Sequence, residues 1–436
     1  MKKLLYTSIF LFFITGSNAQ SLYFPPISGN TWETTSPDSL GWCTDKIDPL
    51  FDFLKLKNTK AFIVLKDGKI VIEKYYDNFV QDSIRYWASA GKTLTGMLVG
   101  IAQQEGYLKI TDKSSKYLQV GWTSMPQAKE DLITIQNQLS MTTGLDDGVP
   151  ENDCTIDTCL VYKADAGTRW AYHNAPYTLL DKVIESATGK TFNTYFAQAI
   201  RNKIGMNGIW VKQDFNNIYF STPRSMARYG LLLLNKGNWD GNSIINDLSY
   251  INDMTNSSQN INKSYGYLTW LNGKDSYMLP QSQVIFNGSL MKDAPNDLFA
   301  AEGKNGQIIN VVPSQNLVIV RMGNSPGDGF GNISNFFNND IWTYLNEIIC
   351  NSTSTKDHIE ESVDLTLASN LVKNQLHIIN NGVDGEIEIQ IYNTNGSLVY
   401  FNKNQYTIDI SSLKNGTYFI KLKTKEVSKT LKFVKI

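Results

Sequence analysis

The character of the sequence changes near residue 350, and this change restricts the chain to more than one folding unit. All nine tryptophans lie between Trp32 and Trp342, and the last of the four cysteines is Cys350. After Asp364 the chain consists of short alternating segments separated by Asn-Gly and Lys-Asn-Gly turns, a pattern typical of antiparallel strands. The 436 residues also exceed what one hydrophobic core usually organises. We therefore expect two domains of different composition.

The predicted division is a larger domain over residues 20–350, a polar linker over 351–362 and a small all-β sandwich over 363–436. Four alternating runs predict strands in the sandwich: 375–379, 386–392, 406–410 and 417–422.

The larger domain combines strand and helix signals. Residues 61–65 and 69–73 flank a Lys-Asp-Gly turn and predict a hairpin, and helical periodicity follows Ser89 and Asn174. Further strands are expected at 265–271, 307–312 and 317–322, and a closing helix at 333–349. Strands at both ends with helices between them predict an α+β fold with one antiparallel sheet.

The N-terminal segment has the pattern of a secretory signal peptide over residues 1–19. Two lysines precede an apolar run over 4–14, and small residues end at Ala19. That run is too short to span a bilayer, and the sequence has no other run of eighteen apolar residues. We expect an exported protein without a stable membrane span.

Composition restricts the chemistry. A net charge of −1 argues against a nucleic-acid binder that relies on a basic surface. Only three histidines are present, His173, His358 and His377, and there is no C-x-x-C or H-E-x-x-H motif. We expect no metal and no cofactor, and chemistry based on hydroxyls, amines and carboxylates.

The four cysteines are candidates for disulfides, because export permits them. Four cysteines allow three pairings. Cys154 and Cys159 are close enough to close one loop, which would leave Cys43 to pair with Cys350 across the larger domain. Four reduced, buried thiols remain the alternative.

One motif suggests a nucleophile. Ser89 and Lys92 form S-x-x-K at a predicted helix start, which places the amine one turn from the hydroxyl on the same face. The amine can take the serine proton, and the helix N-terminus favours a developing anion. The motif alone is weak, since Ser289 and Ser411 begin two further matches.

Two further triplets follow in order. Tyr172 and Asn174 form Y-x-N in a predicted loop, and Lys304 and Gly306 form K-x-G before a predicted strand. A phenol beside ammonium groups can act as a base, and an amide can hold a lysine or a substrate carbonyl. Each triplet also recurs elsewhere by chance, so the order and context carry the signal.

With these motifs the chain, from about residue 45 to 349, resembles the serine β-lactamase and penicillin-binding protein superfamily. It is most similar to class C β-lactamases, related esterases and 6-aminohexanoate-dimer hydrolases. The resemblance also rests on segments 134–145, 167–174, 221–230, 265–270 and 306–313. It implies a β-lactamase/transpeptidase-like fold, an antiparallel sheet flanked by helices with a helical subdomain.

The resemblance implies roles for the motif residues. Ser89 would be the acylated nucleophile, Lys92 its proton partner, and Tyr172 the base that also activates water. Asn174 would hold the acyl amide or Lys92. A chain this poor in histidine must find its base elsewhere, which agrees with this assignment.

The third triplet would complete the substrate site. Lys304 would lower the tyrosine pKa and attract an anionic group, and the backbone N–H groups of Ser89 and Gln307 would form the oxyanion hole. The implied substrate-binding residues are Asn174, Lys304, Asn305, Gly306 and Gln307.

Two departures from the family pattern affect the expected activity. Asn305 stands where efficient β-lactamases usually carry a hydroxyl, and His173 where a small residue is common. We therefore expect a secreted esterase, amidase or D-amino-acid peptidase, with β-lactamase activity weak. His173 either contacts substrate or is a structural histidine. The alternative function is a penicillin-sensing domain that is acylated without efficient turnover.

The tail over about 363–436, ending in the basic segment 429–435, resembles the sorting domain of the type IX secretion system. This implies a secreted or cell-surface protein that travels through the periplasm and uses the type IX secretion machinery as partner. A carbohydrate-binding or spacer sandwich is the alternative.

Overall fold

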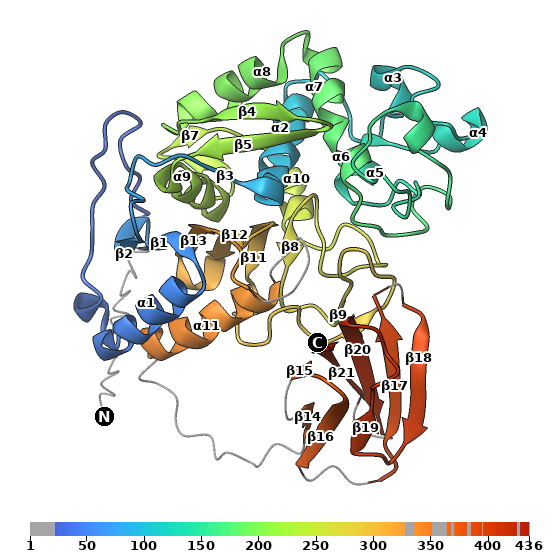
Figure 1. Ribbon diagram of the computed structural model, residues 1–436. Coiled ribbons are helices and arrows are strands. Elements are labelled where there is room, and N and C mark those ends of the chain that lie inside the picture. Colours follow the sequence, from blue (N-terminus) through green and yellow to red (C-terminus); the bar gives the residue numbers. More distant parts are fainter. Residues whose placement is uncertain are drawn as a thin grey trace, which may run out of the picture.

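The computed structural model describes residues 22–327, 335–350, 364–367, 370–381, 385–394, 396–424 and 428–435 (Figure 1). The predicted signal peptide, 1–19, and the predicted linker, 351–362, lie outside these ranges. None of the helices within them is long and apolar enough to cross a membrane.

The centre of the larger part is a six-stranded sheet in the order β2-β1-β13-β12-β11-β8, with every neighbouring pair antiparallel. Its strands are β1 (Thr59–Lys66), β2 (Lys69–Tyr75), β8 (Trp270–Leu271), β11 (Phe299–Gly303), β12 (Gln307–Val312) and β13 (Leu317–Gly323). This sheet confirms the predicted α+β fold.

The β1–β2 hairpin forms where predicted. Its turn holds Asp67 and Gly68 at φ of 50° and 84°, and a β-carbon on Gly68 would lie 1.9 Å from the carbonyl oxygen of Tyr23. Only glycine fits this turn without displacing the neighbouring chain.

The strand predicted at 265–271 is mostly wrong, because only β8 is extended. Leu268 has φ of 53°, and the Gly266 N–H donates to the carbonyl of Thr269, so the chain turns there. The short β11 has no alternating pattern and was missed.

Helices cover both faces of the sheet. In Figure 1, α1 (Ile47–Leu56) and α11 (Asn335–Ile349) pack on one face, and α9 (Pro223–Leu234) packs on the other. The predicted closing helix is α11.

Between these elements lies a mainly helical region. Its helices are α2 (Lys92–Gln104), α3 (Ser115–Leu118), α4 (Gln127–Glu130), α5 (Ile135–Leu139), α6 (Asn174–Thr178), α7 (Leu180–Thr188), α8 (Phe192–Ala199) and α10 (Leu248–Met254). Its short strands are β3 (Arg85–Tyr86), β4 (Ile209–Gln213), β5 (Asn216–Ser221), β6 (Asn238–Trp239) and β7 (Asn242–Ser243). The short pair β9 (Ser276–Tyr277) and β10 (Phe286–Asn287) follows β8 in the chain and lies beside the C-terminal part. The helices predicted after Ser89 and Asn174 are α2 and the α6–α7 pair.

The C-terminal part contains a three-stranded sheet, β14-β16-β19, and a five-stranded sheet, β15-β21-β20-β17-β18. Its strands are β14 (Asp364–Leu367), β15 (Leu371–Val372), β16 (Gln375–Asn381), β17 (Glu388–Asn393), β18 (Leu398–Lys403), β19 (Thr407–Asp409), β20 (Gly416–Lys423) and β21 (Ser428–Lys435). It has its own hydrophobic core. The β15–β21 pair is parallel, which differs from the predicted antiparallel pattern.

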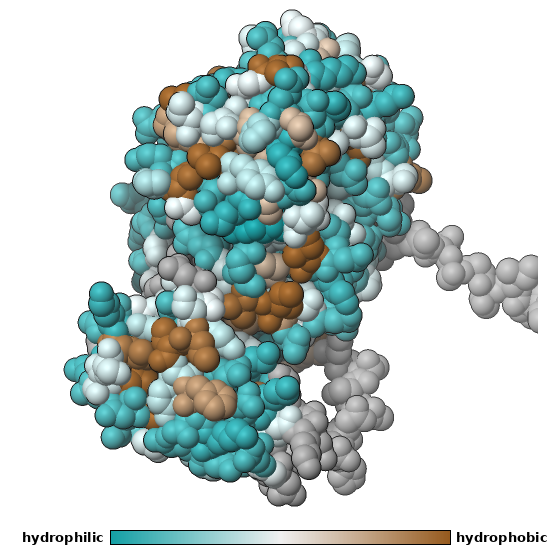
Figure 2. Space-filling view, turned by 90° about the vertical axis from the view of Figure 1, so that its right-hand side faces the viewer, coloured by the Kyte–Doolittle hydropathy of each residue, from teal (hydrophilic) through white to brown (hydrophobic). Residues whose placement is uncertain are grey.

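The edge strand β18 leaves Leu398, Val399 and Phe401 exposed. Figure 2 shows apolar side chains at the surface of this lower part of the molecule. These side chains belong to the sandwich but lie outside its core.

Two disulfides link the four cysteines, Cys43 with Cys350 and Cys154 with Cys159. The pairing that the short Cys154–Cys159 spacing favours is confirmed, and the alternative of four free thiols is wrong. The first disulfide connects the segment before α1 to the end of α11, and the second closes a small loop.

We expect the Cys43–Cys350 disulfide to be the more stabilising one, because 307 residues separate its cysteines and only 5 separate the other pair. Replacing Cys43 and Cys350 by serine should lower the free energy of unfolding by about 5 kcal/mol, against about 2 kcal/mol for Cys154 and Cys159. Urea unfolding of the larger part, followed by tryptophan fluorescence, measures both. Equal losses would contradict the chain-entropy explanation.

Candidate active site

Ser89 lies in a tight 3-10 turn, Ala88–Gly91, directly before α2. The preceding Trp87 is fully buried and donates its backbone N–H to the Tyr219 carbonyl (2.8 Å) and its indole N–H to Ser221 Oγ (2.7 Å). Ala88 has φ of 48°, a strained value for a residue with a β-carbon. The serine is therefore held at a constrained position at the start of the helix.

Lys92 points at this serine from the first turn of α2. Its Nζ donates to Ser89 Oγ at 3.0 Å, and only 4% of the residue is exposed. The Nζ also lies 4.2 Å from the centre of the Tyr177 ring and 5.1 Å from that of Tyr172. Burial lowers the pKa of Lys92 to about 7, and the charge of Asp153 opposes this shift. At neutral pH the amine is thus partly unprotonated and able to accept a proton.

Tyr172 has the opposite protonation behaviour. Burial raises the pKa of its phenol, a hydrogen bond with Ser89 lowers it, and the charge of Glu302 raises it further. The pKa of Tyr172 is therefore raised overall, in contrast to the lowering that was expected from Lys304. The ring stacks on Trp270, with 5.7 Å between the ring centres. The phenol therefore keeps its proton at neutral pH.

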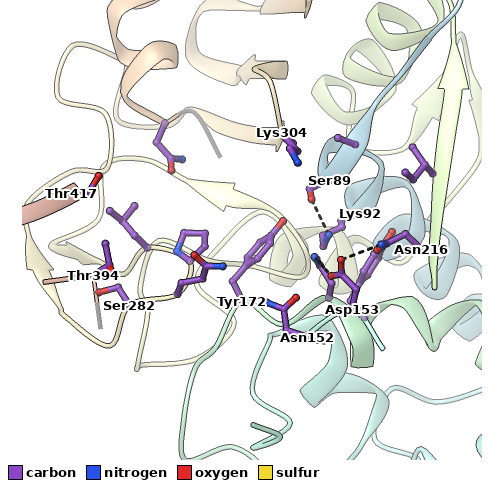
Figure 3. A pocket seen from close by; sticks show the side chains of 18 of the residues that line it. Ser89, Lys92, Asn152, Asp153, Tyr172, Asn216, Ser282, Lys304, Thr394 and Thr417 are labelled. Carbon is purple, nitrogen blue, oxygen red and sulfur yellow. Dashed lines mark hydrogen bonds between the residues drawn. The ribbon is translucent and has the colours of Figure 1, made fainter. Parts of the chain in front are cut away.

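A pocket of about 410 Å³ opens beside these groups (Figure 3). It is lined by five of the residues singled out in the sequence, Ser89, Lys92, Tyr172, Asn174 and Lys304. Lys304 is exposed at its rim. The volume of the pocket is in the range typical of small-molecule sites.

Asn305, Gly306 and Gln307 are absent from the pocket lining. The Asn305 side-chain amide donates to the Tyr86 hydroxyl (2.6 Å), and the carbonyls of Asn305 and Gly306 accept from Arg321 (2.6 and 3.0 Å). The Gln307 amide donates to the Gly323 carbonyl (2.7 Å). These hydrogen bonds fix the β11–β12 turn and direct all three residues away from the predicted substrate contacts.

Gly303, at the end of β11, lies directly against the serine turn. A β-carbon on Gly303 would lie 2.5 Å from the Trp87 carbonyl oxygen, 2.8 Å from the Ala90 nitrogen and 3.0 Å from the Ser89 nitrogen. The backbone of β11 thus contacts the backbone of the serine turn directly. Glycine permits this approach, and any side chain would push the two apart.

Asp153 is the main polar group that sequence reasoning missed. Its carboxylate accepts from the side-chain amides of Asn174 (2.7 Å) and Asn216 (3.3 Å), and it lies beside the Cys154–Cys159 disulfide. The Asn174 side-chain amide therefore donates its hydrogen bond to Asp153 and not to Lys92. The Asn174 Oδ1 atom is buried without a hydrogen-bond partner.

His173 is buried and does not line the pocket, and burial lowers its pKa to about 4. Its neutral imidazole is consistent with the structural interpretation. The described residues contain no group of three His, Cys, Asp or Glu side chains that could hold a metal.

The pocket also includes Thr394, Thr417 and Phe419 from the C-terminal sandwich. No sequence pattern indicates this contact, because the three residues lie in ordinary β-strand and turn patterns far from the motifs.

Comparison with known proteins agrees with this fold. Residues 59–339 match the β-lactamase family model, and residues 370–436 match the model of the secretion system C-terminal sorting domain. An uncharacterized protein of Alkalihalophilus pseudofirmus is 24% identical over 327 residues, which cover 65% of this chain and 90% of that protein.

Solved structures show the same fold. A putative 6-aminohexanoate-dimer hydrolase from Bacillus anthracis is similar with a TM-score of 0.54 and 18% identity, covering 74% of this chain and 90% of that one. A family VIII carboxylesterase is similar with a TM-score of 0.54 and 14% identity, covering 72% and 99%.

Members of the matched family are generally hydrolases, and the sorting domain indicates type IX secretion and a secreted or cell-surface protein. The chain belongs to the β-lactamase family and carries a type IX secretion sorting domain at its C-terminal end.

Proposed function

We propose that this protein is a serine hydrolase that cleaves an ester or amide bond through an acyl-enzyme on Ser89. The observation that carries the proposal is the 3.0 Å hydrogen bond from Lys92 Nζ to Ser89 Oγ, combined with a burial that brings the amine pKa to about 7. A base with a pKa near the working pH combines availability with proton-transfer strength.

The reaction begins when the neutral Lys92 amine takes the Ser89 proton as Oγ bonds to the substrate carbonyl carbon. This gives a lysine ammonium and a tetrahedral oxyanion. The ammonium proton passes to the leaving oxygen or nitrogen as its bond to carbon breaks, and the acyl group stays on Ser89. Water then attacks the carbonyl carbon of the acyl-Ser89 ester and loses a proton to the Lys92 amine. The bond from that carbon to Ser89 Oγ breaks, the Lys92 ammonium returns the proton to Oγ, and the acid is released. Tyr172, which keeps its proton, donates a hydrogen bond to the leaving group instead of acting as the base.

The oxyanion would be held by the backbone N–H groups of Ser89 and Lys304. The contact of Gly303 with the Ser89 backbone supports this choice, because Lys304 is the next residue along the edge of β11. Lys304 replaces Gln307 in this role, since Gln307 is absent from the pocket lining. Loss of one such donor typically costs about 3 kcal/mol in the barrier.

The proposed substrates are those of a carboxylesterase, an amidase or a D-amino-acid peptidase. Asn174 lines the pocket, and its side-chain amide suits an acyl group that carries an N–H. The strand β11, Phe-Ala-Ala-Glu-Gly, has no hydroxyl to help bind a β-lactam carboxylate. The names of the two structural neighbours, an amide hydrolase and a carboxylesterase, agree with this choice.

The proposed domain limits are 20–350 for the hydrolase, 351–362 for the linker and 363–436 for the sorting domain. The signal peptide at 1–19 would direct export to the periplasm, from which the type IX machinery would take the protein to the surface.

The direct test of this function uses the full-length protein and Ser89→Ala. We expect turnover of a chromogenic short-chain ester or a D-Ala-D-Ala peptide, faster than that of a chromogenic cephalosporin, and a loss of at least about 1,000-fold in Ser89→Ala. Stable labelling by the cephalosporin without turnover of any substrate would favour the penicillin-sensing alternative. Equal behaviour of the two proteins would exclude Ser89 as nucleophile.

The pH dependence of kcat/KM tests the role of Lys92. Because the unprotonated amine is the active form, the rate should rise with pH and level off above about 7. Asp153 raises the lysine pKa, so Asp153→Asn should move this limb to lower pH. Asp275→Asn, at a carboxylate whose side chain is 84% exposed, is the control.

Glu302 titrates in the same range, because burial raises its pKa to about 7. The Glu302→Gln variant separates the two groups. If the rise of kcat/KM with pH persists in this variant, it belongs to Lys92. If the rise disappears, it belongs to Glu302, and the assignment to Lys92 is contradicted.

The contact between β11 and the serine turn predicts a sensitive glycine. Gly303→Ala should lower kcat/KM about 100-fold, because a displacement of about 1 Å at the reacting atoms has that effect. Circular dichroism and the rate of Ser89 labelling by a fluorophosphonate distinguish a displaced serine from an unfolded protein. Unchanged labelling in a folded variant would refute the close contact.

A further inference from the structure

The strand β20 of the C-terminal sandwich presents two different faces. Tyr418, Ile420 and Leu422 alternate along it and pack in the sandwich core. Thr417 and Phe419 occupy the opposite side of the strand, as the strand alternation requires. A phenylalanine on the outer side of a small sandwich would ordinarily be exposed to solvent. Phe419 is nevertheless buried, with only 6% of its surface exposed.

The hydrolase part covers this face. Phe419 packs in the core cluster of the larger part, and its ring centre lies 5.0 Å from that of Phe286 in β10. Lys432, opposite Phe419 in the β20–β21 pair, places its amine 5.1 Å from the centre of the Phe336 ring. Near the β17–β18 turn, a β-carbon on Gly396 would lie 3.6 Å from Val284. Three separate points therefore join the two parts.

This contact lies at the active-site pocket. Thr394, Thr417 and Phe419 line it together with Phe336 and the loop residues Leu279 to Ser282. In Figure 3, Thr394 and Thr417 lie beside Ser282 at the end of the pocket opposite Ser89 and Lys92. The sandwich residues are thus far from the reacting atoms and close to where the remote end of a substrate would extend.

We infer that the C-terminal sandwich forms the distal wall of the substrate pocket and limits the length of the substrate that Ser89 can process. The inference rests on the proposed function, since it requires a substrate bound at Ser89. With the sandwich in place, the pocket accepts short acyl groups. With the sandwich displaced, the distal end is open and longer groups fit.

The test compares kcat/KM for 4-nitrophenyl octanoate and 4-nitrophenyl acetate in the full-length protein. Phe419→Asp places a charge in the contact and should raise the octanoate-to-acetate ratio at least tenfold. Thr417→Trp fills the distal end and should lower the ratio at least fivefold. The matched control is Phe401→Asp, because Phe401 is 52% exposed on β18 of the same sandwich, and its ratio should equal that of the unaltered protein.

An unchanged ratio in Phe419→Asp and Thr417→Trp, with Ser89-dependent turnover of acetate present, would overturn the inference. So would an equal change in Phe401→Asp, because the effect would then reflect a general loss of sandwich structure. Absence of Ser89-dependent turnover of both esters in all four proteins would instead refute the proposed function, so the two failures are distinguishable.

Discussion

The candidate active site depends on the burial of the Lys92 amine beside Ser89. An ammonium removed from water loses hydration, and this loss brings the lysine pKa to about 7. The faces of Tyr172 and Tyr177 lie against the amine, and the charge of Asp153 opposes the shift, so the protonated form remains accessible near neutral pH. The same burial keeps the Tyr172 phenol protonated, and one cause thus separates a proton acceptor from a proton donor.

The surrounding structure holds this pair in place from two sides. On one side the central sheet brings Gly303 against the backbone of the serine turn, and the hydrogen bonds of Arg321 fix the β11–β12 turn behind it. On the other side Asp153, beside the Cys154–Cys159 disulfide, binds Asn174. A glycine and a disulfide loop far apart in the sequence therefore support the same few atoms.

The sorting domain has a second physical role in this arrangement. Its fold needs only one face of β20 for its own core, which leaves the other face available for Phe419 to pack on the hydrolase part. The domain that carries the secretion sorting signal thereby also lies at the end of the pocket. The apolar side chains Leu398, Val399 and Phe401 of β18 remain exposed and take no part in this contact.

The sequence by itself determined the features that depend on neighbours along the chain: the Ser89–Lys92 spacing on one helical turn, the β1–β2 hairpin, the change from a tryptophan-rich part to alternating strands, and the short Cys154–Cys159 loop. Tertiary structure decided the protonation behaviour of these two groups, because the desolvation of Lys92 and Tyr172 exists only once distant segments enclose them. It also decided that Gly303 contacts the serine turn, since the pairing of β11 and β12 sets which residue reaches that edge. Asp153 and Phe419 could not be found from the sequence, because their roles come from contacts between segments that no local pattern connects.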